Sequence, residues 1–271
     1  MLRKEWKIAF SLWCVALVAG ILCLVFYLLS VTGFWHAPDL VTPMQLLPPF
    51  FFAVVTLATA ILVRKWPGPV LLTALMTTCA LGAYTIGDVL NSLNINYWGG
   101  AVFGLGHLLY GSPLLAPAYS TSDPAPDYAG GFVLNVGAFA AFPLFCTAVF
   151  GGTAALPFTA FLFALYGVTL GVAHFRGEVA PSNVYTRLSA MAYVMFAASD
   201  TLVFCTIVGA VTETVATRLY VHIIYFIALA LIALEEVQRC YYGPIQLVKR
   251  KEEKSRHEHA EEEEEEEVEE S

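Results

Sequence analysis

Two aspartates and a histidine lie inside apolar stretches of this sequence, where ionisable side chains are rare. The stretch YTIGDVLNSLNINYWGGAVFGLGHLLY (residues 84–110) holds Asp88, His107 and Tyr110, and a second apolar stretch holds Asp200. Two carboxylates in one site can act as general acid and general base when burial, or the charge of one, keeps the other protonated. We therefore expect proton-transfer chemistry at Asp88 and Asp200, with His107 orienting one of them or relaying a proton.

The composition places these side chains in a membrane. Hydrophobic side chains make up 58% of the 271 residues and charged side chains only 13%, whereas a soluble domain is about 45–50% apolar. A charged group near the bilayer centre costs about 2.5–3.5 kcal/mol on insertion scales, so an acid at that depth indicates a function.

Eight apolar stretches are each about long enough to cross a bilayer as a helix, which takes about 20 residues. They cover residues 8–31, 44–63, 69–91, 97–118, 131–150, 153–174, 188–210 and 217–238. The first stretch is too long for a signal peptide and no clear cleavage site follows it. The sequence therefore predicts an all-α, polytopic membrane protein with eight transmembrane helices.

The distribution of basic residues predicts the topology. With eight spans and a cytosolic N-terminus, the cytosolic side receives 13 of the 14 Lys and Arg residues, and only Arg218 falls on the other side. Cytosolic loops carry an excess of Lys and Arg, so this asymmetry places both termini in the cytosol.

The end of the chain differs in composition from the rest. Residues 249–271 contain a basic patch and then seven consecutive glutamates, and of the 22 acids in the chain 12 lie in the last twenty residues. Such a segment cannot bury apolar surface. We expect a transmembrane domain over residues 1–248 and a disordered acidic cytosolic tail over residues 249–271, which a protein partner could bind. The net charge of −8 is a property of the tail, because residues 1–248 carry 10 acids and 9 bases, so we expect no steering by global charge. We also expect no nucleic-acid partner.

The depth of each polar residue in the membrane indicates which of them can lie close together. At a rise of about 1.5 Å per residue, five of them reach the outer half of the membrane: Gln45, Asp88, His107, Asp200 and His222. Glu235 and Glu236 end the last span, where we expect them to reach water. His107 and His222 with an acid could form a zinc site, but no HxxxH or HExxH spacing favours one, so we expect no metal and no other cofactor.

A short internal similarity relates the two acids. Gly87-Asp88-Val89-Leu90 in the third span resembles Ser199-Asp200-Thr201-Leu202 in the seventh, and each is the third span of a four-span half. A 4+4 pseudo-repeat about an axis along the membrane normal would bring the two carboxylates to similar depth.

These motifs resemble the YhhN-like lysoplasmalogenase family of multispan membrane proteins. The matching positions are Gly87-Asp88, the FGLGHLLY block with His107 and Tyr110, Ser199-Asp200, and Tyr225 of the last span. The likeness covers roughly residues 8–238. The chain departs from the family pattern at Gln45, where a lysine commonly precedes a proline, and at Leu229, near which some members carry a glutamine.

The resemblance implies hydrolysis of the vinyl ether of lysoplasmalogens, which gives a fatty aldehyde and glycerophosphoethanolamine or glycerophosphocholine. Asp88 and Asp200 would be the acid and base, while Tyr110 or Tyr225 would hold the water or a glycerol hydroxyl. We expect Ser199, Gln45 and His222 to line the lysophospholipid site. The expected location is the endoplasmic reticulum or another endomembrane. Two alternatives are a catalytically silent lipid-binding or scaffold relative, which Gln45 suggests, and a proton-coupled transporter, since intramembrane acids also form proton relays.

Overall fold

In the computed structural model, the described residues form a bundle of long helices. They are residues 2–35, 38–65, 68–93, 96–111, 188, 191–192, 195–196, 198–199, 202–203, 206, 211–239 and 241. The labelled helices are α1 (Leu2–Val31), α2 (Pro38–Val63), α3 (Gly68–Ser92) and α4 (Asn96–Gly111). A further helix covers Val215–Arg239. Every regular element in these residues is a helix and none is a strand, which confirms the all-α prediction.

The predicted spans agree with the helices where the structure describes them. The first three and the eighth lie within α1, α2, α3 and the Val215–Arg239 helix, and the described part of the fourth lies within α4. The predicted spans 131–150 and 153–174, and the tail 249–271, lie outside the described residues, and only scattered helical residues of the span 188–210 are described. The described part of α4 ends at Gly111, and residues 112–118 of the fourth predicted span lie outside the described residues.

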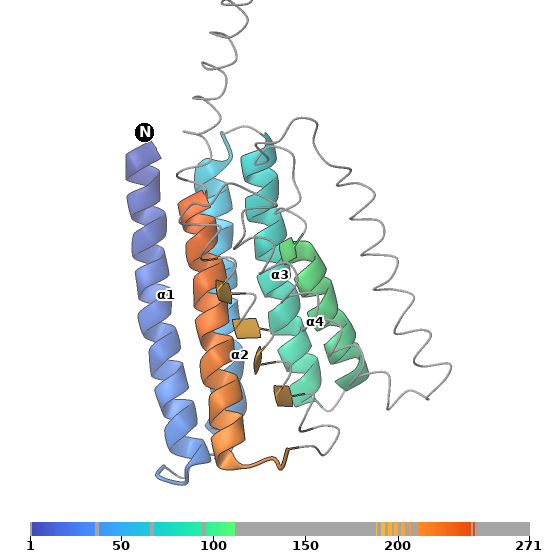
Figure 1. Cartoon of the computed structure of the whole chain (residues 1–271). Coiled ribbons are helices and arrows are strands. Elements are labelled where there is room, and N and C mark those ends of the chain that lie inside the picture. The colour runs from blue at the N-terminus through green and yellow to red at the C-terminus, as the bar shows by residue number, and fades with distance from the viewer. Residues whose placement is uncertain are drawn as a thin grey trace, which may run out of the picture.

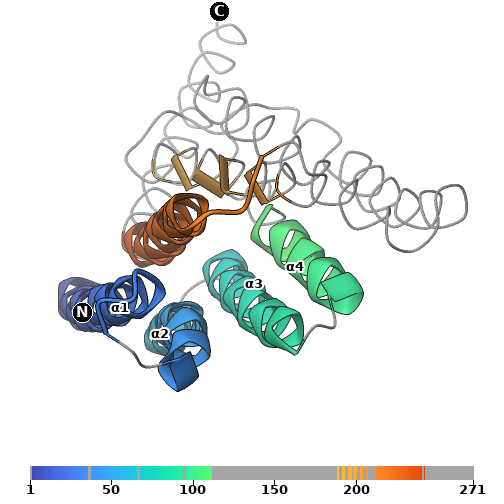
Figure 2. The same cartoon turned by 90° about the horizontal axis from the view of Figure 1, so that it is seen from below.

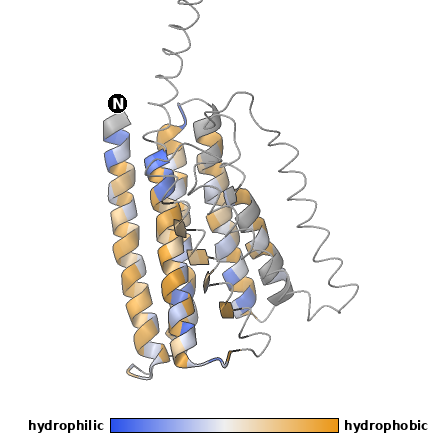
Figure 3. Cartoon of the chain, in the orientation of Figure 1, coloured by the Kyte–Doolittle hydropathy of each residue, from blue (hydrophilic) through white to orange (hydrophobic). Residues whose placement is uncertain are grey.

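Three of these helices are long and apolar enough to cross a membrane: Lys4–Val31, Leu40–Val63 and Val215–Arg239. Their apolar side chains do not all turn inward. On α1, for example, Val15 and Val18 are 67% and 59% exposed, as expected for a surface in contact with lipid. Hydrophobic residues dominate the middle of the helices, and hydrophilic residues gather toward the ends (Figure 3). The chain is therefore a membrane protein.

Consecutive helices pack side by side and run in opposite directions (Figure 1). Seen from below, α1 to α4 form an arc in chain order, and the Val215–Arg239 helix lies on its concave side (Figure 2). The ends of α1 and α3 and the starts of α2, α4 and the Val215–Arg239 helix lie at one end of the bundle. We call it the first-loop end, because the α1–α2 connection lies there.

Glycines allow the helices to approach closely. A Cβ at Gly20 of α1 would lie 2.5 Å from the Phe226 ring of the Val215–Arg239 helix. Between α3 and α4, a Cβ at Gly99 would lie 3.0 Å from the Gly87 carbonyl oxygen, and one at Gly106 would lie 3.1 Å from the Ala80 carbonyl oxygen. Close approach through small residues is a common way to pack helices in lipid, where van der Waals contact drives association.

The Val215–Arg239 helix begins at a capping box. The Thr217 backbone N–H donates to Thr214 Oγ1 at 3.2 Å, and the Thr214 N–H donates to Thr217 Oγ1 at 2.8 Å. This exchange satisfies two backbone donors that a helix start leaves without an intrahelical partner. The cap fixes the first turns of the helix, which carry Arg218 and His222.

Candidate functional site

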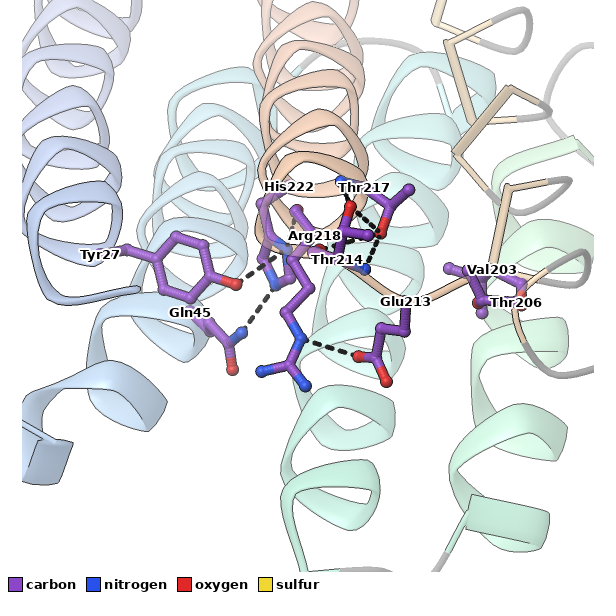
Figure 4. A network of polar contacts seen from close by, with 9 residues as sticks. All are labelled: Tyr27, Gln45, Val203, Thr206, Glu213, Thr214, Thr217, Arg218 and His222. Carbon is purple, nitrogen blue, oxygen red and sulfur yellow. Dashed lines mark hydrogen bonds and ion pairs between the residues drawn. The ribbon is translucent and has the colours of Figure 1, made fainter. Parts of the chain in front are cut away.

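His222 is held by side chains from α1 and α2 at the first-loop end of the bundle. Its Nδ1 lies 2.7 Å from the Arg218 carbonyl oxygen and 3.2 Å from the Tyr27 hydroxyl, and its Nε2 lies 2.7 Å from Gln45 Nε2. Tyr27 and Gln45 both point toward the imidazole (Figure 4). A carbonyl can only accept, so this network assigns the proton to Nδ1 and makes Nε2 the acceptor of the Gln45 amide N–H.

A small cleft opens beside this network. Its lining comes from α1, α2 and the Val215–Arg239 helix: Leu24, Tyr27, Gln45, Pro48, His222 and Tyr225 are among its residues. Pro48 and Pro49 also line it and have no backbone N–H, so the carbonyls of Met44 and Gln45, four residues earlier, lack their helical donor. The cleft thus combines apolar walls with hydrogen-bonding groups from three helices.

Asp88 adjoins the cleft through Tyr225. The Tyr225 hydroxyl donates a hydrogen bond of 2.9 Å to Asp88 Oδ2, and the Tyr225 ring packs against Phe103 of α4 and Phe196, with centroid distances of 5.8 and 5.6 Å. We call the set Tyr27, Gln45, Asp88, His222 and Tyr225 the His222 cluster.

The structure describes only part of the remaining predicted site. Ser199 is buried, and its hydroxyl lies 3.5 Å from the Val221 carbonyl oxygen, one residue before His222. Asp200 and the side chain of His107, which belongs to α4, lie outside the described residues. Leu229 is fully buried and lines the cleft. Gln45, His222, Tyr225, Asp88 and Ser199 therefore lie at the same end of the bundle.

Tyr110 lies elsewhere, in a second polar cluster. Its hydroxyl donates to Glu235 Oε2, near the opposite end of the Val215–Arg239 helix from His222. Arg239 contacts both neighbouring glutamates, Glu235 through Nη2 and Glu236 Oε2 through Nη1 at 3.2 Å. Thr77 of α3 donates to Glu236 Oε2 at 2.8 Å. We call Thr77, Tyr110, Glu235, Glu236 and Arg239 the Arg239 cluster.

This second cluster corrects the prediction that the two glutamates reach water. Glu235 and Glu236 are 1% and 0% exposed, and Arg239 is 2% exposed. They stay buried because the guanidinium and two hydroxyls from α3 and α4 replace the water that charged groups would otherwise need. The sequence does contain a signal for these ion pairs. Arg239 follows Glu235 by four residues and Glu236 by three, and residues at these separations are neighbours on a helix.

Sequence reasoning also missed Tyr27. This residue is 2% exposed, and its ring packs against the His222 ring with centroids 4.4 Å apart and the planes tilted by 31°. A tyrosine near the end of a span is typical of the aromatic belt at the membrane interface, so nothing in the sequence separates Tyr27 from an interfacial anchor.

The chemistry open to the His222 cluster is proton transfer and hydrogen bonding. It offers a carboxylate, two phenolic hydroxyls, an amide and an imidazole. Within the part of the chain that the structure describes, no three His, Cys, Asp or Glu side chains come together to hold a metal ion. No protein-family model matches the sequence, and no significant match to a curated protein or to a solved structure was found.

Proposed function

We propose that the protein hydrolyses the vinyl ether of lysoplasmalogens, with Asp88 and Asp200 as the acid and base. The observation that carries the proposal is the hydrogen bond from Tyr225 to Asp88 beside the cleft. It joins the two positions that the family resemblance assigns to the third and last spans, although they lie 137 residues apart in the sequence.

The reaction needs one proton donor and one base. The acid protonates the β-carbon of the vinyl ether, which leaves an oxocarbenium ion at the α-carbon. The base accepts a proton from water as the water oxygen bonds to that carbon, giving a hemiacetal. The hemiacetal then collapses to the fatty aldehyde and the free glycerol hydroxyl. Glycosidases divide the same labour between two carboxyl groups around a similar cation.

The geometry of the His222 cluster fits these roles. Tyr225 holds Asp88 Oδ2 at 2.9 Å and so fixes the carboxyl group beside the cleft. The space in the cleft for the centre of a water molecule is about 20 Å³, and about 10–15 Å³ is enough to hold one water. His107 would support one carboxyl group, and Gln45 and His222 would bind polar groups of the lysolipid.

In the proposed architecture, the site lies at the same depth in the bilayer as the vinyl ether bond of a lysolipid. We propose eight spans with both termini in the cytosol and a 4+4 pseudo-repeat, in the endoplasmic reticulum or another endomembrane. The His222 cluster would then lie in the outer half of the bilayer, near the border between headgroups and hydrocarbon, where the vinyl ether of a lysolipid lies. A lysolipid could enter this site sideways from the bilayer.

The test is fatty-aldehyde release by purified protein in matched micelles. We expect release from a vinyl-ether lysolipid and none from its acyl counterpart. Asp88→Asn and Asp200→Asn should each lower turnover by about 10²–10⁴-fold, because each removes one partner of acid–base catalysis. Both variants should fold, since a neutral amide costs less to bury than an unpaired charge. Near-wild-type turnover in both variants would exclude the mechanism.

A second candidate function is a silent lipid-binding relative, which the Gln45–His222 contact favours. Gln45 stands where the family pattern has a lysine, and its amide is committed to His222 at 2.7 Å. If this candidate is correct, wild type releases no aldehyde under conditions where a lysoplasmalogenase is active. Gln45→Lys is the informative variant, because it restores the ammonium group; aldehyde release by this variant alone would identify Gln45 as the cause.

A further inference from the structure

Arg218 and Glu213 form an exposed ion pair beside the His222 cluster, at the first-loop end of the bundle. Arg218 Nε lies 2.8 Å from Glu213 Oε1, and the two side chains are 54% and 59% exposed. An exposed pair of this kind contributes little to folding stability, so stability does not account for an arginine at this position. Of the lysines and arginines whose side chains the structure describes, Arg218 alone lies at this end, and the others are Lys4, Lys7, Arg64, Lys65 and Arg239.

The backbone of Arg218 ties this ion pair to the His222 cluster. The Arg218 carbonyl oxygen accepts from His222 Nδ1 at 2.7 Å, and the Arg218 N–H donates to the Thr214 carbonyl oxygen at 3.1 Å. A helical side chain leans toward the N-terminal end of its helix, so the guanidinium group lies beyond the imidazole. Figure 4 shows it there, beside the Glu213 carboxylate. The pair therefore forms the outer edge of the candidate site.

Exposed aromatic rings indicate the depth of the pair in the membrane. Trp35 lies in the α1–α2 connection, Trp98 near the start of α4, and Tyr220 in the first turns of the Val215–Arg239 helix. They are 42%, 62% and 54% exposed. Exposed tryptophan and tyrosine gather at the membrane interface, at the level of the headgroups. All three lie at the first-loop end, so Arg218 and Glu213 lie at headgroup depth.

The spacing along the Val215–Arg239 helix matches the length of a lysolipid. Arg218 and Tyr225 are seven residues apart, which is about 10 Å of helix. In a lysoplasmalogen, seven covalent bonds join the β-carbon of the vinyl ether to the phosphorus, and an extended chain that advances about 1.2 Å per bond covers about 8 Å. A lysolipid with its vinyl ether beside Asp88 and Tyr225 would thus present its phosphate to the guanidinium group.

The two charges of the pair match the two charges of a zwitterionic headgroup. The ion pair engages one guanidinium nitrogen and one carboxylate oxygen. The guanidinium group has two further nitrogens, whose N–H groups can bind a phosphate in a bidentate manner, and the carboxylate can accept from an ammonium group. A headgroup with a phosphate and no cation meets repulsion from Glu213. Because both side chains are exposed, a headgroup reaches them from outside the cleft.

We propose that the Arg218–Glu213 pair binds the zwitterionic headgroup of the lysophospholipid substrate, a role that rests on the proposed function of the His222 cluster. Arg218 donates to the phosphate, and Glu213 pairs with the cation of the ethanolamine or choline group. The pair therefore selects zwitterionic lysolipids over anionic lysolipids and over lipids without a phosphate.

The experiment measures the binding of three lysolipid analogues that share one saturated 1-O-alkyl chain and so lack the vinyl ether. They carry glycerophosphoethanolamine, glycerophosphoglycerol or glycerol alone. Affinity for the full chain in detergent is measured by native mass spectrometry over a series of lipid concentrations. Wild type should bind the phosphoethanolamine analogue about 5–10-fold more tightly than either of the other two, the usual effect of one charged residue at a membrane surface.

Each member of the pair has its own variant. Arg218→Gln should weaken the binding of both phosphate-containing analogues by about 5–10-fold and leave that of the alkylglycerol unchanged. Glu213→Gln should bind the phosphoglycerol analogue as tightly as the phosphoethanolamine analogue, because this change removes both the repulsion and the partner of the ammonium group. Arg64→Gln is the matched control, since Arg64 is an exposed arginine at the opposite end of the bundle. It should keep the wild-type order of lipids.

Equal wild-type affinity for the phosphoethanolamine analogue and the alkylglycerol would overturn the proposal, and so would a preference for the phosphoglycerol analogue. The wild-type order in both Arg218→Gln and Glu213→Gln would also overturn it. Binding is independent of turnover here, because none of the analogues contains the bond that the proposed reaction cleaves. If wild type shows the expected order but releases no aldehyde from a vinyl-ether lysolipid, the headgroup site stands and the hydrolysis is refuted.

Discussion

The two polar clusters of the bundle handle buried charge in different ways. In the Arg239 cluster, two carboxylates share one guanidinium and two hydroxyl donors, and every residue is at least 98% buried. In the His222 cluster, the carboxyl group of Asp88 is only partly buried and receives a hydroxyl, beside a cleft with room for water. The first carboxyl groups are enclosed by ion pairs and hydroxyl donors, whereas the carboxyl group of Asp88 keeps part of its surface open beside a cleft-lining residue.

The largest effect on stability should come from Arg239→Met. This change leaves Glu235 and Glu236 buried without their cation, which typically costs about 3–5 kcal/mol. The free energy of unfolding in detergent measures the loss. Arg218→Met is the matched control on the same helix, because the Arg218–Glu213 pair is 54% and 59% exposed and such pairs contribute about 0–1 kcal/mol. Equal losses in the two variants would contradict the structural role of the Arg239 cluster.

A smaller loss should follow from Gly106→Ala, which probes the α3–α4 contact between the two clusters. The added Cβ would lie 2.5 Å from the Tyr84 ring and 3.1 Å from the Ala80 carbonyl oxygen. Overpacking of this kind costs about 1–3 kcal/mol. Tyr84 packs on Phe103, which in turn contacts Tyr225, so turnover should fall together with stability.

The control for the packing experiment is Gly82→Ala in α3. No atom lies within 4 Å of a Cβ at that position, and alanine has a higher helix propensity than glycine by about 1 kcal/mol. Thermal unfolding should therefore show opposite signs for the two variants. A loss of stability at Gly82 as large as that at Gly106 would mean that helix spacing is not the cause.

The smallest effect should come from Tyr225→Phe. It removes one hydroxyl bond to Asp88 and keeps the ring contacts with Phe103 and Phe196. A hydrogen bond of this kind contributes about 0.5–1.5 kcal/mol, so turnover should fall about 2–10-fold while the unfolding temperature changes little. Tyr220→Phe, at a position 54% exposed, should leave turnover unchanged. An unchanged rate in Tyr225→Phe would show that this hydroxyl does not position Asp88.

Hydropathy predicted the helices because a bilayer demands long apolar segments whatever their partners are. The predicted span 44–63 lies within α2, which begins at Pro38 and continues through Pro43, Pro48 and Pro49. The helix starts earlier because hydropathy detects only its apolar part, whereas helical hydrogen bonds continue into the interface. The same span lengths also placed Gln45, Asp88 and His222 at one end of the bundle.

Side-chain partners were harder to predict than depth. Tyr225 was predicted to hold the water or a glycerol hydroxyl, and in the structure its hydroxyl donates to Asp88. The family resemblance assigned Tyr110 to the same site as His107, but the Tyr110 hydroxyl reaches Glu235. Which helix a side chain faces depends on the rotation of each helix in the bundle. Hydropathy carries little information about that rotation when a helix is apolar on most sides.

The positions of Glu235, Glu236 and Arg239 have a consequence for biosynthesis. The arginine lies four and three residues after the glutamates, so both ion pairs can form within a single isolated helix. Pairing reduces three formal charges to a net charge of −1 before any neighbour is present. The Val215–Arg239 segment can therefore leave the translocation channel as one helix, and assembly with Thr77 and Tyr110 then supplies the hydroxyl donors that the remaining charge requires.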